Sequence, residues 1–257
     1  QSLNINVEFL NGNKIFINHL ELTDDLWHRP KSKSIFLYIV YKSVMNHDIT
    51  KDKLIDDILY NSKDIKYDAI ADVEINKVRK TLQTFISDLF KENIKKEILV
   101  IKGKKYQLTS GKIEVEIETD FEKFKKLCSS NKYSDKYSAI DLYKTDFGES
   151  LYQNWAEDIR ENLRFIYSET VHKLIAYYEN LKDTTVVKKL LERLVESEFS
   201  DDENMIKLLS IYNEGKDFRK IKFMYNLYEK RLKKEFNIQP SDELKKFYQE
   251  VIPGSLN

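Results

Sequence analysis

The sequence predicts a mainly α-helical protein in which an α+β segment is followed by an all-α segment. The 257 residues include only 6 Gly and 3 Pro, so the chain has few places for sharp turns. Strand-like alternation occurs in the first part, and amphipathic helical patterns fill the second. Hydrophobic residues at 41% and charged residues at 33% indicate a folded chain with a heavily charged surface.

The first segment alternates strand and helix signals. Residues 3–10 and 15–17 flank Asn11-Gly12-Asn13, which predicts a β-hairpin. The elements expected next are helices over 31–45, 51–59 and 72 to about 91, then a second hairpin over 97–108. Sheet, three helices and hairpin is the order of a winged helix-turn-helix domain. We therefore expect a winged-helix DNA-binding domain over residues 1–110.

The second segment, residues 111–257, reads as helical after a bridging stretch at 113–138. Predicted helices cover about 152–180, 184–197, 201–214, 217–235 and 241–251. YENLKD at 178–183 and YNEGKD at 212–217 lie 34 residues apart, each at a turn between two predicted helices. That spacing is the tetratricopeptide period, so we predict an all-α tetratricopeptide-like repeat domain, with a plain helical bundle as the alternative.

Composition and motifs argue against several classes of protein. Lys plus Arg and Asp plus Glu each number 43, so bulk charge does not favour a nucleic-acid partner. The lone Cys128 predicts a reducing, cytoplasmic setting, and no stretch approaches the roughly 20 apolar residues that span a bilayer. Enzyme motifs and metal-ligand spacing are absent, so we expect no enzyme, cofactor or metal. The start at Gln1 is compatible with a piece of a longer chain.

The third predicted helix has two different faces. At 100° per residue, an apolar stripe forms from Ile75, Val78, Leu82, Phe85, Ile86 and Leu89. The opposite face carries Asn76, Lys80, Gln83, Thr84, Ser87 and Lys91. Amide and cationic side chains can meet guanine and adenine edges in a major groove, and hydroxyls can reach phosphates. An ordinary solvated helix face has the same composition, and Asp88 at its edge counts against DNA.

Two basic clusters flank this helix in the predicted order. Lys102, Lys104 and Lys105 surround the Gly turn of the second hairpin, and Arg29, Lys31 and Lys33 lie where the first helix begins. Both clusters would suit backbone phosphates, as basic groups and helix N-termini do. Lysines on a turn are equally common for solubility alone.

Read together, the two segments resemble the SARP class of bacterial transcription activators over nearly the whole chain. In the first segment the resemblance rests on WHRPK at 27–31, ITKDKLID at 49–56, TL with FISDL at 81–89, and GKKYQL at 103–108. In the second it rests on FEKF at 121–124, YKTDF at 143–147, Trp155 with Arg160 and Leu163, YEKRL at 228–232, and EFNIQPSDEL at 235–244. That class joins an OmpR-type winged helix to a tetratricopeptide-like bacterial transcriptional activator domain.

The resemblance implies sequence-specific binding of double-stranded DNA at promoters, side-by-side copies on direct repeats, and contacts to RNA polymerase subunits. It places DNA contacts on Lys80, Gln83, Thr84, Ser87 and Lys91, the face that the helical periodicity selects. The sequence departs from the family pattern at Asp88, Phe90 and Lys105. We expect Trp155, Arg160 and Tyr143 to be packing and hydrogen-bonding residues.

A different class of function stays open beside this one. The winged helix can have lost DNA binding, in which case the chain is a protein-interaction module whose repeats hold a peptide or a neighbouring domain. The near-neutral charge and Asp88 favour this alternative. The sequence names neither the promoter nor the activating signal.

Overall fold

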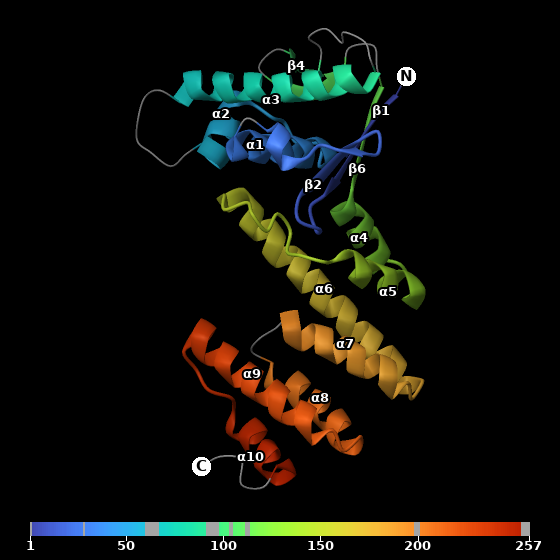
Figure 1. Cartoon of the computed structure of the whole chain (residues 1–257). Helices are drawn as coiled ribbons and strands as arrows, with labels where there is room; N and C mark the ends of the chain where they lie inside the picture. The colour runs from blue at the N-terminus through green and yellow to red at the C-terminus, as the bar shows by residue number, and fades with distance from the viewer. Residues whose placement is uncertain are drawn as a thin grey trace. The chain divides into compact units, whose positions relative to one another are not determined.

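The computed structural model describes residues 2–27, 29–59, 67–90, 98–102, 105–110, 114–197 and 201–252 (Figure 1). By its internal contacts the chain divides into two compact units, Gln1–Tyr167 and Ser168–Asn257. The described residues are mostly helical with a small N-terminal sheet, the class that the sequence predicts. Among them, no helix combines the length and apolar character needed to cross a membrane.

The first unit contains a four-stranded sheet, a two-stranded hairpin and the helices around them. Its strands are β1 (Ser2–Glu8), β2 (Lys14–Ile17), β3 (Leu20–Glu21), β4 (Ile98–Lys102), β5 (Lys105–Ser110) and β6 (Glu114–Thr119). Its helices are α1 (Pro30–Val44), α2 (Lys51–Leu54), α3 (Tyr67–Phe90), α4 (Asp120–Cys128), α5 (Tyr133–Leu142) and the first part of α6 (Asn154–Asn180). A π-helical turn over Ile55–Leu59 continues α2.

The N-terminal hairpin forms where the sequence predicts it. β1 and β2 pair antiparallel, and the turn between them places Gly12 and Asn13 in the left-handed region, at φ of 76° and 57°. Glycine and asparagine tolerate that region best. Leu3, Ile5 and Val7 alternate along β1 and are fully buried, so this strand supplies part of the core.

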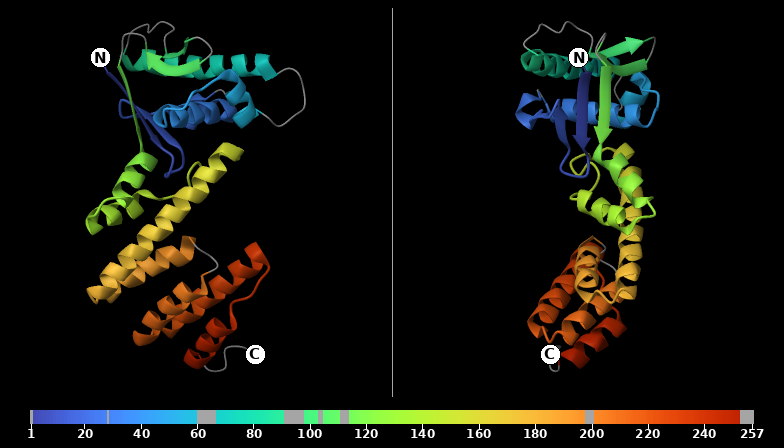
Figure 2. Two further views of the ribbon diagram at one scale, coloured as in Figure 1. Left: turned by 180° about the vertical axis from the view of Figure 1, so that it is seen from behind. Right: turned by 90° about the vertical axis from the view of Figure 1, so that its right-hand side faces the viewer.

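A strand that the sequence analysis did not predict completes the sheet. β6 pairs in parallel with β1, and the sheet order is β3-β2-β1-β6 (Figure 2). Directly after β6, both carboxylate oxygens of Asp120 accept hydrogen bonds, from the backbone N–H groups of Phe9 and Leu10, each at 2.8 Å. The bridging stretch therefore closes the first unit, which extends past the predicted domain boundary at 110/111 as far as Tyr167.

Three helices and a hairpin follow the sheet in the predicted order. α1 begins at Pro30, and the Thr50 hydroxyl caps α2 by accepting from the Lys53 backbone N–H at 3.2 Å. α3 starts at Tyr67 rather than near residue 72 and packs on α1 and α2 (Figure 1). A backbone hydrogen bond of 2.7 Å from Tyr106 to Ile49 ties the β4–β5 hairpin to the segment before α2.

Aromatic rings and one buried guanidinium join the sheet to α4 and α6 within the first unit. The Phe9 and Phe147 rings stack with centroids 4.8 Å apart, and Phe121 meets both rings edge-on. Arg160 donates to the backbone oxygens of Phe147, Gly148 and Leu151 at 2.9 to 3.2 Å. These contacts, with that of the Tyr143 hydroxyl to Asp146 at 3.0 Å, are those of residues that hold the fold, as we expected.

The described part of the second unit consists of helices and the turns between them. The helices are the last part of α6, then α7 (Thr184–Ser197), α8 (Asp202–Glu214), α9 (Phe218–Phe236) and α10 (Asp242–Val251). The α6–α7 and α8–α9 turns are equivalent residue by residue: Lys182 and Lys216 have φ of 58° and 56°, and Asp183 and Asp217 each accept a backbone N–H three residues later, at 3.1 and 3.0 Å. The repeated sequence therefore corresponds to a repeated turn.

Candidate nucleic-acid interface

The polar face that the sequence selects on α3 is accessible. Asn76, Lys80 and Thr84 are exposed, and Gln83 and Ser87 are half-buried. The apolar stripe turns inward, since Ile75, Val78, Leu82 and Ile86 are all buried. Lys91 lies outside the described residues. The structure thus brings together five of the six residues of the predicted face on one side of one helix.

A buried carboxylate holds α3 against the start of α1. The Glu74 side chain is 4% exposed; it accepts from the Ser32 hydroxyl at 3.0 Å and from Lys77 Nζ at 2.7 Å, and the Arg29 guanidinium lies 3.8 Å away. Burial raises the pKa of this carboxyl, but the hydrogen bonds from Lys77 and Ser32 and the charges of Lys77 and Arg29 outweigh burial and lower it. Glu74 therefore stays ionised and links α3 to the start of α1.

The basic cluster at the start of α1 is less accessible to a phosphate than its three cations indicate. Lys31 is exposed, and the Arg29 side chain is 66% exposed although it lies near Glu74. Lys33 forms an ion pair with Asp24, and only 16% of its side chain is exposed. Contact with a phosphate would require Lys33 to leave Asp24, so Lys31 and Arg29 are the better candidates.

The hairpin contributes one described cation. Lys105 is exposed, and its Nζ lies 2.8 Å from Asp48, which precedes α2; the hydrogen bond from Lys105 lowers the pKa of Asp48. Lys104 and the side chain of Lys102 lie outside the described residues. At the far end of the α3 face, Asp88 is exposed and Phe90 is half-buried. An anion at that end would oppose a phosphate.

One cation of α3 was missed by the sequence analysis. Arg79 is half-buried, and its Nη1 donates to Asn76 Oδ1 at 3.0 Å, so the guanidinium reaches the edge of the polar face. Its sequence signal is its position, four residues before Gln83 and three after Asn76, which places it beside both on a helix. A site built on α3 includes Arg79.

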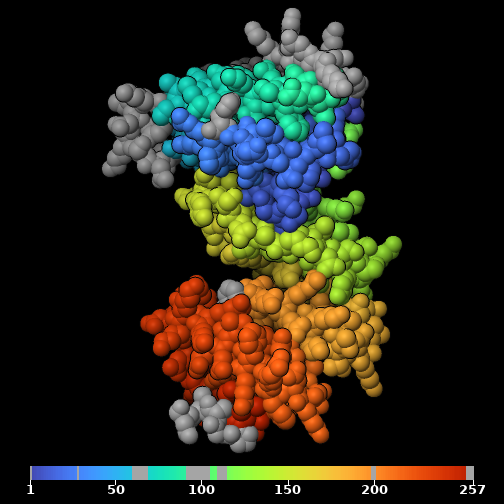
Figure 3. All heavy atoms as spheres, viewed as in Figure 1, coloured from blue at the N-terminus to red at the C-terminus, as the bar shows by residue number. Residues whose placement is uncertain are grey.

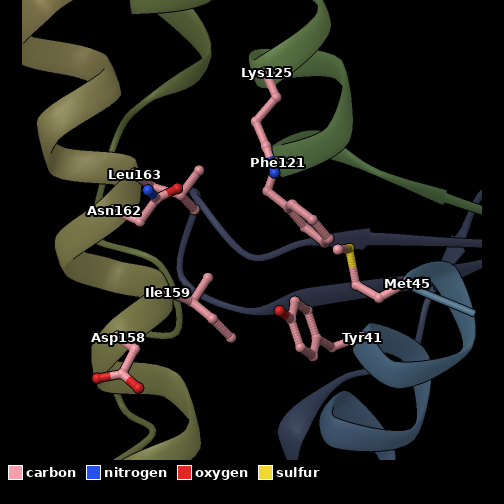
Figure 4. A pocket seen from close by; sticks show the side chains of 8 residues that line it. All are labelled: Tyr41, Met45, Phe121, Lys125, Asp158, Ile159, Asn162 and Leu163. Carbon is pink, nitrogen blue, oxygen red and sulfur yellow. The ribbon is translucent and has the colours of Figure 1, made fainter. Parts of the chain in front are cut away.

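A pocket of about 220 Å³ lies elsewhere in the first unit, where α1, α4 and α6 meet (Figure 4). Tyr41 of α1 faces Ile159 of α6 across it, Met45 follows the end of α1, and Phe121 and Lys125 come from α4. Ligand pockets usually hold roughly 300 to 1,000 Å³, so this one is small, and we assign it no ligand. Within the described ranges, no group of three or more His, Cys, Asp or Glu side chains could hold a metal ion.

Comparison with known proteins supports the fold and goes no further. No protein-family model matches the chain, and no curated protein matches it in sequence. Among solved structures, it is similar to Mycobacterium tuberculosis EmbR in complex with a low affinity phosphopeptide, with a TM-score of 0.55 and 13% sequence identity. The match covers 97% of this chain and 64% of that chain, so this chain spans less than two thirds of EmbR. At this level of sequence identity the likeness supports the fold alone.

Proposed function

We propose that this chain is a sequence-specific, double-stranded-DNA-binding transcription regulator that activates initiation at promoters. The observation that carries the proposal is the α3 face: amide, hydroxyl and cationic side chains are accessible together, on a helix whose apolar stripe is buried and whose Glu74 bonds to Ser32 of α1. The fold likeness to EmbR supports a regulatory role independently of that face.

In this proposal different side chains of α3 contact the bases and the phosphates. Lys80 and Gln83 meet base edges, and Asn76 and Arg79 extend the same row toward the helix start. Thr84 and Ser87 reach phosphates, while Lys91, Lys31 and Arg29 anchor the backbone with Lys102, Lys104 and Lys105 of the hairpin. Copies bound side by side on direct repeats, and contacts to RNA polymerase subunits, belong to the same proposal.

The test is selection of bound duplexes from a randomised pool, followed by fluorescence anisotropy on the selected duplex and a scrambled one over a salt series. Selective binding whose log affinity falls linearly with log salt is expected. Lys80→Ala and Gln83→Ala should each weaken specific binding by about 1 to 3 kcal/mol, with a smaller effect on the scrambled duplex. Lys123→Ala, an exposed cation on α4 of the same unit, is the matched control.

Two outcomes would overturn parts of the proposal. A footprint unchanged by both α3 substitutions would remove α3 as the reading helix. Equal binding of selected and scrambled duplexes, or none near physiological salt, would favour the second candidate function, a protein-interaction module with a winged helix that no longer binds DNA. The exposed Asp88 and the ion pairs that engage Lys33 and Lys105 are the observations that favour this second function.

A further inference from the structure

Helix α9 in the second unit concentrates positive charge in a chain whose net charge is zero. Its 19 residues include seven Lys or Arg and two Glu, a net charge of +5. The buried side of the helix, with Ile221, Met224, Tyr225, Tyr228 and Leu232, packs inward, and α9 contacts α8. The charge is therefore displayed on the outer side, and part of α9 is visible at the surface in Figure 3.

One stripe of this helix, which we call the basic face of α9, is exposed along four turns. It consists of Arg219, Lys222, Phe223, Asn226, Lys230 and Lys233. These residues recur every three or four positions, so they share one side of the helix. In the described part of the chain, none of its four cations forms an ion pair with a carboxylate. At ~1.5 Å per residue the stripe is about 20 Å long.

An aromatic anchor point lies at one end of the basic face. The Phe223 side chain is 59% exposed and borders a hollow of about 340 Å³ lined by Asp217, Arg219, Lys220 and Phe223. Lys220 Nζ lies 5.8 Å from the centroid of the Phe223 ring, and Phe218 nearby in sequence is also exposed. The one acid that lines the hollow, Asp217, accepts a hydrogen bond from the backbone N–H of Lys220. An apolar ring beside two cations is the composition of an interface with an anchor residue and a charged rim.

We propose that the basic face of α9 docks an acidic protein segment that places one apolar side chain against Phe223. Charge complementarity selects the acidic residues, which would follow the four cations along the stripe. The exposed ring and its hollow favour a protein over a DNA duplex, because a duplex backbone offers phosphates to the lysines but no apolar group to Phe223. This inference does not depend on DNA binding by α3.

The ionic contacts of the four cations and the apolar contact of Phe223 respond differently to salt, and the proposal requires both kinds of contact. Exposed ion pairs contribute little individually and are screened by salt. A face that acted by charge alone would therefore bind any polyanion and release it as salt rises. An apolar contact at Phe223 adds a component that salt does not weaken.

The experiment uses the full chain and a fluorescein-labelled synthetic peptide of roughly 15 residues, with Glu at helical i, i+4 spacing and one central Phe. A second peptide with Ala in place of that Phe has the same charge. Anisotropy near physiological salt should show the Phe peptide binding about tenfold tighter. Phe223→Ala should abolish that difference, and Lys222→Glu with Lys230→Glu should weaken both peptides about tenfold or more.

Two matched control variants change other residues of the same unit. Phe236→Ala removes another exposed ring of α9 that lies off the basic face, and Lys189→Glu reverses an exposed charge on α7; neither should alter peptide binding. Circular dichroism checks that each variant is folded. DNA binding should be the same with and without the Lys222→Glu and Lys230→Glu changes.

Several results would overturn the proposal. Equal affinity for the Phe and Ala peptides would show that charge alone acts at this face. Loss of duplex binding in the doubly reversed variant would make the face a phosphate contact. Self-association of the chain that the same variant abolishes, measured by analytical ultracentrifugation, would show that the occupant is a second copy.

Discussion

Helices α3 and α9 both pack an apolar stripe inward and present a polar face, yet the two faces differ in charge. α3 carries four acidic and three basic residues, whereas α9 carries two and seven. The exposed residues of α3 include one amide, one cation and one hydroxyl, on Asn76, Lys80 and Thr84, which are suited to contacts with base edges and phosphates, and two acids, Asp72 and Asp88. The basic face of α9 instead presents four cations and Asn226 around the exposed Phe223, a composition suited to an acidic protein surface. The same apolar period therefore presents two faces of different composition.

The two helices are also held in place by different interactions. Buried Glu74 ties α3 to Ser32 of α1. α9 is held by aromatic burial: the Tyr225 and Tyr248 rings stack with centroids 3.8 Å apart and planes within 4°. Anchoring by a carboxylate depends on its ionisation, and anchoring by stacked rings does not. The stability of the α3 anchor should therefore respond to pH, and that of the α9 anchor should not over the same range.

The largest loss of stability is expected from substitution of Tyr225, whose side chain is buried, with 1% of the residue exposed. Tyr225→Ala removes the stack and leaves a cavity, so the free energy of unfolding of the second unit should fall by about 3 to 5 kcal/mol. Tyr225→Phe keeps the ring and removes a buried hydroxyl that has no hydrogen-bond partner in the described part of the chain, so it should be close to neutral. Hydrogen exchange of residues 218–251 measures both; equal losses would mean that the hydroxyl is the anchor.

The next effect concerns Glu74. Glu74→Gln should lower the free energy of unfolding of the first unit by about 1 to 3 kcal/mol near neutral pH, because the charge-assisted bonds are lost. The pKa of Glu74 is lowered on folding, so its contribution is complete above the unfolded value of about 4.3 and is lost as pH falls below it.

Denaturant unfolding of both proteins between about pH 3 and 7 tests this, and the difference between them should shrink toward the acid end. Asp72→Asn on the same helix is the control, because Asp72 is 57% exposed where it meets Lys51. Its cost should stay within about 1 kcal/mol. A Glu74 difference that is independent of pH would contradict the electrostatic anchor.

The smallest loss of stability is expected from substitutions in the two repeated turns. Asp217→Ala removes the N-cap of α9, and Asp183→Ala removes the equivalent bond before α7; each should cost about 1 kcal/mol. The first turn of α9 holds Arg219 and Lys220 and no acid, so loss of Asp217 should cost more at low salt than at high salt. Thermal unfolding over a salt series compares the two variants, and a salt-independent Asp217 effect would speak against this account.

Local patterns predicted much of the fold. The hairpin around Gly12, the five long helices of the second segment and the inward stripe of α3 lie where the sequence places them. β6 was not predicted, although Val115 and Ile117 alternate with glutamates, because the run is short and its partner β1 lies more than 100 residues away. A local pattern can indicate a strand but cannot name a distant partner.

The candidate site was also predictable only where local sequence patterns define it. Helical periodicity alone selected the α3 face, and Asn76, Lys80 and Thr84 are exposed on it. The availability of the cations was not predictable, since Lys105 meets Asp48 and Arg29 lies near Glu74 only once distant segments have packed. Whether these residues bind DNA stays a prediction.

The parallel pairing of β1 with β6 has a consequence for the order of folding during synthesis. β1 leaves the ribosome early, but the neighbour that covers its open edge, and the Asp120 carboxylate that binds Phe9 and Leu10, follow about 110 residues later. Until then β1 is an edge strand with unpaired backbone groups, the kind that pairs with other chains. A fragment that ends near residue 110 keeps this edge permanently. We therefore expect such fragments to aggregate, and chains that continue through α4 to stay dispersed.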